Sequence, residues 1–539
     1  MKIWLLRLLG AVGLFLSGGH APARLSAAFA VLLTFASSAS AVIERHQLPP
    51  IAEYAASPTY ELTVDGLNVQ VTRFDSGYDY AHFTRVSGSM NLQVKTLYGS
   101  ISQWAISPAK LPIAATVSGN TMSFTLNQEH YLIIATDGRR LVIAIDPPYV
   151  KPPSSGAGIR NVVTQYGANN QGGGWATAAV QAAIDDTHNA GGGIVYVPVG
   201  RYYVGNLTLK SNVHLFMEGG AVFRFHGTSA NYTHDAFKSS QNRWLTWWIK
   251  TTAGSTNVKI YGRGTLDANA TNTIGPNNFA CNVVVPLGTS NFTMEGIVVR
   301  DAGTWSVIPA RSHNITFKNV KMFNSVLNSM TEDDGIDVNE CQDVVIDGCI
   351  AIAHDDSFST KTWAGTGITV NWPGSPQPVD DVLITNCLAW SDYYAYKIGE
   401  GTNQTQNNVP FVNNVAFDCA VGVGISAKWG NAPVTNTRFE AIDIERVNGN
   451  SWGNSAWWHG WIQDADGLGG GNITGVYLKN IKVRDAGNTA AALEGLNASS
   501  KIDTVTFENV VMPGQTTRAT TLAQMNVTSV QFATNITVR

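Results

Sequence analysis

The chain has 539 residues, a formal net charge of -4 and only 14% charged residues. Its length exceeds what a single hydrophobic core usually supports, so we expect one large domain and one smaller one. Such a weak and balanced charge gives no support for binding to nucleic acid or to an anionic membrane. The five cysteines are too few for a disulfide framework in so long a chain, and their odd number leaves at least one thiol free or paired outside the chain.

Residues 1–41 contain two apolar stretches and end in the small-residue triplet Ala39-Ser40-Ala41. This pattern predicts a secretion signal cleaved after Ala41, with an uncleaved anchor as the alternative. No later apolar run approaches the ~20 residues that a membrane span needs. Glycosylation sequons such as those at Asn206 and Asn291 recur through the rest of the chain. They favour a secreted, extracellular glycoprotein that has no membrane partner once the signal is removed.

Residues 42–150 alternate polar and apolar side chains in short runs, as in "YELTVDGLNVQVTRF", separated by Gly, Asn and Asp. This alternation predicts strands joined by hairpin turns, hence a small N-terminal β-sandwich. Residues 151–160 are rich in Pro, Ser and Gly and predict an extended linker. We therefore expect a second domain over residues 161–539.

The second domain opens with one helical pattern, "WATAAVQAAIDDTHNAGGG", which ends in a glycine stop. No helix is expected after it. Short strands interrupted by Gly or Asn recur instead, as in "FTMEGIVV", "ITFKNVKM" and "VTFENVVM", mostly at intervals of about 23 to 39 residues. Such repeats indicate an all-β fold, a right-handed parallel β-helix whose stacked coils share one core. The helix is expected to cover the otherwise exposed first coil.

Cys349, Cys387 and Cys419 occupy similar places in their repeats. A column of buried thiols inside the solenoid explains this placement better than a metal site does, because a free cysteine behaves as a small apolar residue. We accordingly predict no metal and no other cofactor.

Two acidic clusters stand out in a chain that is sparing with charge: Glu332-Asp333-Asp334 with Asp337, and Asp355-Asp356. Asp355 and Asp356 follow Asp334 by 21 and 22 positions, close to the length of the shortest coil. Residues one coil apart in a solenoid lie side by side, separated by about 4.8 Å. The two clusters are therefore expected to meet on one face.

Crowded carboxylates repel one another, which raises the pKa of at least one and keeps it protonated while another stays ionised. Such a pair suits cleavage of a glycosidic bond, because one carboxyl group protonates the leaving oxygen while the other activates water or attacks the sugar. The alternative is that the aspartates only cap turns. Their one-coil spacing favours the catalytic interpretation.

The segment "WATAAVQAAIDDTHNAGGGIVYVPVGRYYVGNLTLKSNVHLFMEGGAVF" resembles the opening coil of the polygalacturonase family of β-helical glycoside hydrolases. "DDGIDV" and "HDDS" resemble that family's Asn-Thr-Asp-Gly-x-Asp and Asp-Asp motifs, and the resemblance covers roughly residues 161–510. A β-sandwich before the solenoid is similar to the related dextranase and isopullulanase family. Either resemblance implies hydrolysis with inversion, without metal, by three aspartates.

Matched to these motifs, Asp355 is implied as the general acid, with Asp334 and Asp356 holding and activating the water. Inversion would need acid and base carboxyl groups roughly 6.5 to 9.5 Å apart. Asp337 matches the last aspartate of the first motif. We expect Asp337 and His354 to support the catalytic residues.

The sequence departs from the family where the family grips a galacturonate carboxylate. Tyr394 takes the place of a histidine, and Gly424 and Ser426 replace an arginine and a lysine. Loss of the arginine removes a planar partner for a carboxylate. Both a pectic polysaccharide and a neutral α-glucan therefore remain as substrates, the second through a dextranase or isopullulanase type of activity.

Other residues are candidates for contact with the substrate. Lysines near the face that carries the aspartates could compensate for the missing arginine. Tryptophans are candidates because indole rings stack on sugars. The candidates are Lys361, Tyr394, Lys397, Lys428, Trp363 and Trp429. A further cluster, Trp452, Trp457, Trp458 and Trp461, predicts either another stacking surface or a packed lid.

The sequence thus predicts a glycoside hydrolase that acts as a monomer on a polysaccharide. A polysaccharide lyase is one alternative, which would need Ca²⁺ or an Arg or Lys base against a uronate. A glycan-binding solenoid without catalysis is another. The paired carboxylates argue against the latter, because binding a neutral sugar needs no elevated pKa.

Overall fold

The computed structural model describes residues 41–539 except 75–76, 327–330, 450–452 and 454, and it describes the backbone but not the side chains of 274–277. The signal predicted for residues 1–41 lies, apart from Ala41, outside the described residues. No helix in the described part of the chain is long and apolar enough to cross a membrane.

The first eleven strands form two sheets around one hydrophobic core, which confirms the predicted β-sandwich. One sheet has the order β1-β5-β11-β10-β7, with β4 beside β5, and the other has the order β3-β2-β6-β9-β8. In β6 every second residue is buried, as expected for a strand with one face on a core. The strands are β1 (Val42–Arg45), β2 (Tyr60–Val64), β3 (Leu67–Val69), β4 (Val71–Thr72), β5 (Asp79–Ser87), β6 (Met90–Thr96), β7 (Trp104–Ser107), β8 (Thr116–Ser118), β9 (Thr121–Leu126), β10 (Tyr131–Thr136) and β11 (Arg139–Asp146).

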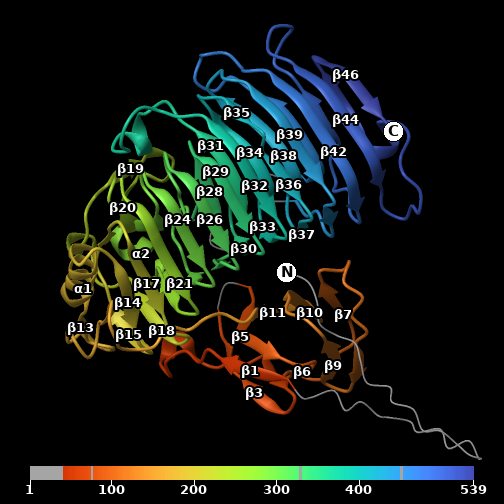
Figure 1. Cartoon of the computed structure of the whole chain (residues 1–539). Coiled ribbons are helices and arrows are strands. Elements are labelled where there is room, and N and C mark those ends of the chain that lie inside the picture. The colour runs from red at the N-terminus through yellow and green to blue at the C-terminus, as the bar shows by residue number, and fades with distance from the viewer. Residues whose placement is uncertain (1–40, 75–76, 327–330, 450–452, 454) are drawn as a thin grey trace, which may run out of the picture. The chain divides into compact units, whose positions relative to one another are not determined.

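The rest of the chain winds into parallel coils (Figure 1). One sheet of 24 strands extends from β12 (Ile159–Asn161) to β46 (Ala533–Val538), and its strands pair in parallel from coil to coil. Equivalent side chains stack inside the solenoid. Phe411 and Phe439, one coil apart, lie face to face with ring centres 4.9 Å apart. The structure confirms the predicted right-handed parallel β-helix.

Helix α1 (Thr177–Asn189) opens the solenoid and packs on its first coils, as predicted. Its apolar face places Val180, Ala183 and Ile184 in the core. The prediction that no further helix follows is wrong, because α2 (Ala270–Asn277) forms in a connection between coils. The Asp301 carboxylate, from another coil, accepts a hydrogen bond from the backbone N–H of Thr271 and so satisfies a donor in the first turn of α2.

The Gly and Asn residues of the repeat adopt left-handed backbone conformations at the turns. Asn319, Gly348 and Asn386 have φ values of 52°, 63° and 56°, a region that glycine and asparagine tolerate best. The asparagine side chains also bond from coil to coil, since Asn413 Nδ2 donates to Asn386 Oδ1 at 2.7 Å. The sequon residue Asn291, in β24 (Ser290–Glu295), has the same left-handed conformation, with φ of 52°. Part of the recurrence of sequons therefore has a structural cause.

All five thiols are buried and none forms a disulfide. Cys349 and Cys387 stand directly before β30 and β33, which pair in register. The next strand, β37, is preceded by Asn414, whose side chain accepts a hydrogen bond from the Cys387 backbone. Burial of the thiols is confirmed, but the predicted three-cysteine column is wrong, because Cys419 follows β37. These strands are β30 (Ile350–Ala353), β33 (Leu388–Ser391) and β37 (Val415–Asp418).

A second sheet of the solenoid carries the acidic clusters. Its seven strands follow the order β28-β31-β34-β38-β41-β43-β45. Single bridges extend the same face toward the N-terminus, from β28 to residues 305–310 and then to β23, which pairs with β20. The strands are β20 (Arg243–Thr251), β23 (Phe279–Val285), β28 (Ile336–Asn339), β31 (Phe358–Thr362), β34 (Tyr394–Thr402), β38 (Val421–Trp429), β41 (Ala456–Ile462), β43 (Ala491–Glu494) and β45 (Val527–Gln531).

Candidate active site

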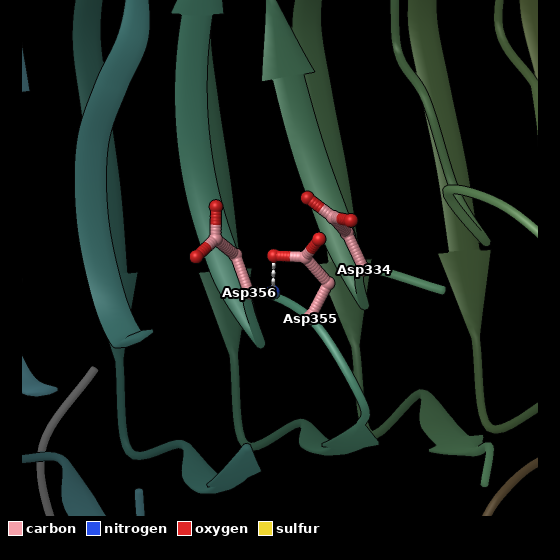
Figure 2. A group of neighbouring side chains, drawn as sticks. All are labelled: Asp334, Asp355 and Asp356. Carbon is pink, nitrogen blue, oxygen red and sulfur yellow. Dashed lines mark hydrogen bonds between the residues drawn. The ribbon is translucent and has the colours of Figure 1, made fainter. Parts of the chain in front are cut away.

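The three predicted catalytic aspartates stand just before two neighbouring strands of this sheet (Figure 2). Asp334 precedes β28, and Asp355 and Asp356 precede β31. The register of these strands places Asp334 beside Asp356. One oxygen of each carboxylate lies within 4.8 Å of the other two. The two acidic clusters therefore meet on one face, as their spacing predicted.

Gly335 allows this close approach. A Cβ atom at this position would stand 2.2 Å from the Ser357 backbone oxygen and 2.7 Å from the Ala351 Cβ atom. The backbone N–H of Gly335 instead donates to the Asp356 carbonyl oxygen at 2.9 Å. Glycine is thus required where the coil of Asp334 lies against the coil of Asp356.

Two buried lysines hold the carboxylates. Lys361 Nζ lies 2.6 Å from Asp334 Oδ2, 2.8 Å from Asp337 Oδ1 and 3.8 Å from Asp356 Oδ2. Lys397 Nζ donates to Asp356 Oδ2 at 2.9 Å. Both side chains are at least nine-tenths buried. The structure therefore places these predicted substrate-binding lysines among the aspartates rather than at a solvated surface.

Each of these aspartates keeps one oxygen without a partner. Asp334 Oδ1, Asp337 Oδ2 and Asp356 Oδ1 are buried and accept no hydrogen bond within the described part of the chain. Burial, followed by the charge of Asp337, raises the pKa of Asp334 well above its ordinary value, although Lys361 opposes the shift. Buried polar atoms are normally satisfied by protein or water, so the free oxygens of Asp334 and Asp356 are each available to accept a hydrogen bond from a water molecule or a ligand hydroxyl group.

Asp355 differs from its neighbours in its contacts. Its Oδ1 atom accepts a hydrogen bond from the Asp356 backbone N–H at 2.9 Å, and no ion pair to it occurs among the residues described here. Burial, and then the charge of Asp356, raise the pKa of Asp355 to about 7 against the opposing effects of Lys397 and Lys361. A carboxyl group with such a pKa can donate a proton at neutral pH.

The three carboxylates could also attract a hard cation, which binds clustered carboxylate oxygens. The ammonium groups of Lys361 and Lys397 already contact one oxygen each of Asp334 and Asp356. A cation would have to share the cluster with two fixed positive charges. The residues present therefore favour a lysine-neutralised site over a metal centre.

Tyr394 fills the space beside Gly424, where the resembled family has an arginine. A Cβ atom on Gly424 would stand 2.7 Å from Tyr394 Cε1 and 2.8 Å from the His459 backbone oxygen. The Lys397 ammonium group lies 4.6 Å from the centre of the Tyr394 ring. The packed Tyr394 ring therefore requires glycine at position 424, because it leaves no room there for a larger side chain.

Two further predicted residues lie at the edges of the cluster. His354 donates its backbone N–H to Asp333 Oδ1 at 2.6 Å, while its ring lies 3.8 Å from Asp392. Through this bond His354 fixes the turn that carries Asp355. Lys428 pairs with Glu400 at 3.3 Å and is only partly buried.

The two tryptophans predicted to flank the site differ in exposure. Trp429 is 36% exposed at the end of β38. Trp363 is partly buried and stacks on Trp305, with ring centres 6.0 Å apart. Only Trp429 therefore presents a large open face.

The tryptophan cluster near the last coils is mostly packed. Trp457 and Trp458 are fully buried in the solenoid core, which supports the packing interpretation over a stacking surface for these two residues. Trp461 is partly buried and stacks on His459, with ring centres 4.2 Å apart. Trp452 lies outside the described residues.

The structure adds Trp305, which the sequence interpretation missed. Because Val307 pairs with Ile336, Trp305 takes the position of Asp334 one coil earlier. The Lys361 ammonium group lies 4.5 Å from the centre of its indole. The coil spacing that linked the aspartates could have found Trp305, but a single aromatic residue carries no signal of its own.

A pocket lies beside Trp305, on the N-terminal side of the aspartates. Trp247, Asn282 and Trp305 line it from three successive coils. Ile368 and Trp372, from the segment after β31, line it as well. The hairpin of β19 (Ala236–Lys238) and β20 contributes Ala236, Lys238 and Leu245 to the lining.

Fold and site together define a β-helical glycoside hydrolase, since parallel coils bring together three carboxyl groups, two of them ion-paired with lysines and the third, Asp355, with a raised pKa. The chain belongs to glycosyl hydrolases family 28, whose family model matches residues 192–529. The resemblance to polygalacturonases inferred from the motifs is thereby confirmed.

Comparison with solved structures supports the fold. A family 28 exopolygalacturonase of Yersinia enterocolitica is 16% identical, with a TM-score of 0.52 and a match that covers 93% of each chain. A hyperthermoactive exopolygalacturonase of Thermotoga maritima is 18% identical, with a TM-score of 0.51 over 72% of this chain and 94% of that one. At such identities the likeness shows the fold alone.

Curated relatives match only in part. Mannuronan C5-epimerase AlgE1 of Azotobacter vinelandii is 49% identical over 65 residues, which make up 11% of this chain and 5% of the epimerase. Iota-carrageenase of Zobellia galactanivorans is 27% identical over 163 residues, or 29% of this chain and 30% of the carrageenase. The chain thus spans a small part of the length of these relatives.

Proposed function

We propose that this protein hydrolyses O-glycosidic bonds in a polysaccharide, with Asp355 as the general acid. The observation that carries the proposal is the meeting of Asp334, Asp355 and Asp356, one oxygen of each within 4.8 Å of the other two. In this cluster burial and the charge of Asp356 raise the pKa of Asp355 to about 7. A carboxyl group that keeps its proton at neutral pH can give it to the leaving glycosidic oxygen. Membership in glycosyl hydrolases family 28 supports the same class of reaction.

Asp334 and Asp356 position and activate the attacking water in this mechanism. Their free Oδ1 atoms can accept its hydrogens, while Lys361 and Lys397 fix the opposite oxygens and keep both carboxylates from rotating away. As the water oxygen bonds to the sugar, the Asp356 carboxylate, which Lys397 holds, takes the water's proton, while Asp334, whose pKa is raised, helps to hold the water. Asp355 transfers its own proton to the leaving oxygen in the same step.

The spacing of the carboxylates departs from our expectation for inversion. One oxygen from each of the three lies within 4.8 Å of the others, closer than the roughly 6.5 to 9.5 Å between carboxyl groups of an inverting pair. A water that contacts Asp334 and Asp356 therefore lies beside Asp355. Inversion is supported by the family resemblance, and proton NMR of the first-formed anomer tests it.

The positive charge of Lys361 and Lys397 supports hydrolysis over elimination. A lyase needs a neutral basic residue to remove a proton from a uronate. Burial alone would lower the pKa of Lys361, but Asp334, Asp337 and Asp356 raise it above its ordinary value. Both Lys361 and Lys397 are thus held as cations in ion pairs and make poor bases.

Product release tests the proposal. Wild type, Asp355→Asn and the control Asp464→Asn, which changes an exposed aspartate, would be incubated with polygalacturonate, rhamnogalacturonan, dextran, pullulan and arabinan in the presence of a chelator. We expect the Asp355 variant to keep its melting temperature and to lose about 10²- to 10⁴-fold in rate, with the control unchanged. Retained hydrolysis would overturn the role of Asp355. Unsaturated uronide products would show a lyase, and glycan binding by wild type without any product would show a binding protein.

The substrate and the location of the protein are parts of the same proposal. The packed Gly424 and Tyr394 supply no arginine for a carboxylate on that side of the aspartates, and the glycan panel separates a pectic polymer from a neutral α-glucan. The apolar segments within residues 1–41 support secretion. Protein recovered from culture medium with its N-terminus directly after Ala41 would agree with that expectation.

A further inference from the structure

The N-terminal sandwich is attached to the solenoid by buried polar contacts, and both belong to one compact unit. Asp146, at the end of β11, lies 2.6 Å from Lys321 Nζ and 3.0 Å from Arg263 Nε, two cations of the solenoid. Tyr131 in β10 donates its hydroxyl to the Asn319 backbone oxygen at 3.1 Å. Because breaking a buried ion pair leaves an uncompensated charge, these contacts join the sandwich firmly to the coils.

Tyr78 of the sandwich packs over the strand that leads to Asp355. It stands directly before β5 and is only 3% exposed. The centre of its ring lies 6.4 Å from that of Phe323 and 5.5 Å from that of Trp390. In register, Phe323 and Trp390 lie on either side of Ile352, which belongs to the same apolar cluster as Tyr78. Tyr78 thus spans three neighbouring strands where the middle one continues into the turn of Asp355. These strands are β27 (Lys321–Phe323), β30 and β33.

The Tyr78 hydroxyl begins a series of hydrogen bonds that ends at this turn. It donates to the Asn324 backbone oxygen at 2.9 Å. The Asn324 side chain donates to the Asp333 carbonyl oxygen, also at 2.9 Å. The Asp333 carboxylate accepts the backbone N–H of His354, the residue before Asp355, at 2.6 Å. Since Tyr78, Asn324 and Asp333 are all buried, water cannot easily replace a bond that is lost from this series.

A second set of contacts holds the same turn from the next coil. Ser391, which follows Trp390, donates its hydroxyl to the Asp355 carbonyl oxygen at 2.6 Å. Ser357 Oγ, two residues after Asp355, donates to the Trp390 carbonyl oxygen at 3.3 Å. The turn is therefore held from both neighbouring coils, and Tyr78 contacts both of them.

We propose that Tyr78 is a positioning residue for the general acid, so that the sandwich supports the active site by fixing the turn of Asp355. Misplacing a catalytic group by 1 Å can cost about 100-fold in rate, and such groups are held in place by the packing and hydrogen bonds around them. By joining the coils on both sides of the turn, Tyr78 keeps the Asp355 carboxyl group in place beside Asp334 and Asp356. The effect on catalysis rests on the proposed function, whereas the support of the turn does not.

Hydrogen exchange in the full chain tests the support of the turn. Tyr78→Phe keeps the ring and removes the hydroxyl donor. The control Tyr131→Phe removes another hydroxyl that donates to a solenoid backbone oxygen, at the opposite end of β27. We expect a peptide over residues 353–357, which contains the bonded N–H of His354, to exchange about 10-fold faster in Tyr78→Phe than in the wild type or the control. Equal exchange in the three proteins, or equally faster exchange in the control, would overturn the inference.

Steady-state kinetics test the consequence for the reaction on a glycan that the wild type hydrolyses. We expect Tyr78→Phe to lower kcat about 10-fold and to change KM less than about twofold, because Tyr78 acts on the acid and touches no sugar. Tyr131→Phe should keep both constants, and melting curves would show that both variants are folded at the assay temperature. An unchanged kcat, a rise in KM alone, or an equal loss in the control would overturn the positioning role. If the wild type hydrolyses no glycan while exchange at the turn is faster in Tyr78→Phe, the proposed function fails and the support of the turn stands.

Discussion

Replacement of Lys361 by methionine would leave three buried carboxylates without their shared cation. Lys361 Nζ is 2.6 Å from Asp334, 2.8 Å from Asp337 and 3.8 Å from Asp356. Removing one partner of a buried ion pair costs about 3 to 5 kcal/mol, because the other partner stays desolvated and unpaired. An unfolding entropy of about 2.1 cal/mol/K per residue amounts to about 1 kcal/mol/K for ~500 residues, so the melting temperature should fall by about 3 to 5 °C near neutral pH.

The pH dependence of this fall in melting temperature tests whether it comes from the unpaired carboxylates. Lys361 opposes the upward shift in the pKa of Asp334, so its removal raises that pKa further above the unfolded value. A group with a raised folded-state pKa stabilises the fold below its unfolded pKa, and this stability is lost as pH rises through the folded pKa. The difference in melting temperature between wild type and Lys361→Met should therefore shrink as pH falls from 8 toward about 4.

Calorimetric or fluorescence melts across this pH range measure the effect. Lys259→Met is the matched control, since its ammonium group contacts Glu295 at 3.0 Å but both side chains are about 30% exposed. An exposed pair is worth only about 0.2 to 1 kcal/mol. A Lys361 variant that melts like the control, or one whose deficit grows on acidification, would refute the assignment of Lys361 as the counterion of the cluster.

Three further predictions concern the site and the core. Activity should fall about tenfold per pH unit above pH 7, because the pKa of Asp355 is about 7 and only the protonated carboxyl group can act as an acid; a rate that stays flat to pH 9 would contradict this role. Gly424→Arg should destabilise the fold by about 1 to 3 kcal/mol in urea unfolding through overlap with Tyr394, and Tyr394→Ala should recover part of the loss; an unchanged midpoint would contradict the packing. All five thiols should be unreactive toward a thiol reagent in the native protein and react together in denaturant, whereas fast native labelling would show an exposed cysteine.

Local sequence was sufficient for much of the solenoid. The spacing of Gly and Asn residues predicted the repeat, because left-handed turn conformations at Asn319 and Gly348 restrict which residues can stand there. The interval between Asp334 and Asp356 equals the register offset of β28 and β31, so the meeting of the carboxylates followed from counting positions. Insertions between strands hide such offsets, which is why Asn414 rather than Cys419 follows Cys387.

By itself the sequence determined the parallel β-helix and the aspartates that meet on it, because a repeating coil converts separation along the chain into distance in space. Tertiary structure alone decided which cations serve those aspartates. Lys361 appeared in the sequence as one of several lysines, and its burial against Asp334 became visible only with the strands in place. Lys238 and Trp372 come from separate insertions, whose position over the coils no period predicts. The raised pKa of Asp355 likewise depends on burial and on charges gathered from several coils, which are properties of the packed molecule.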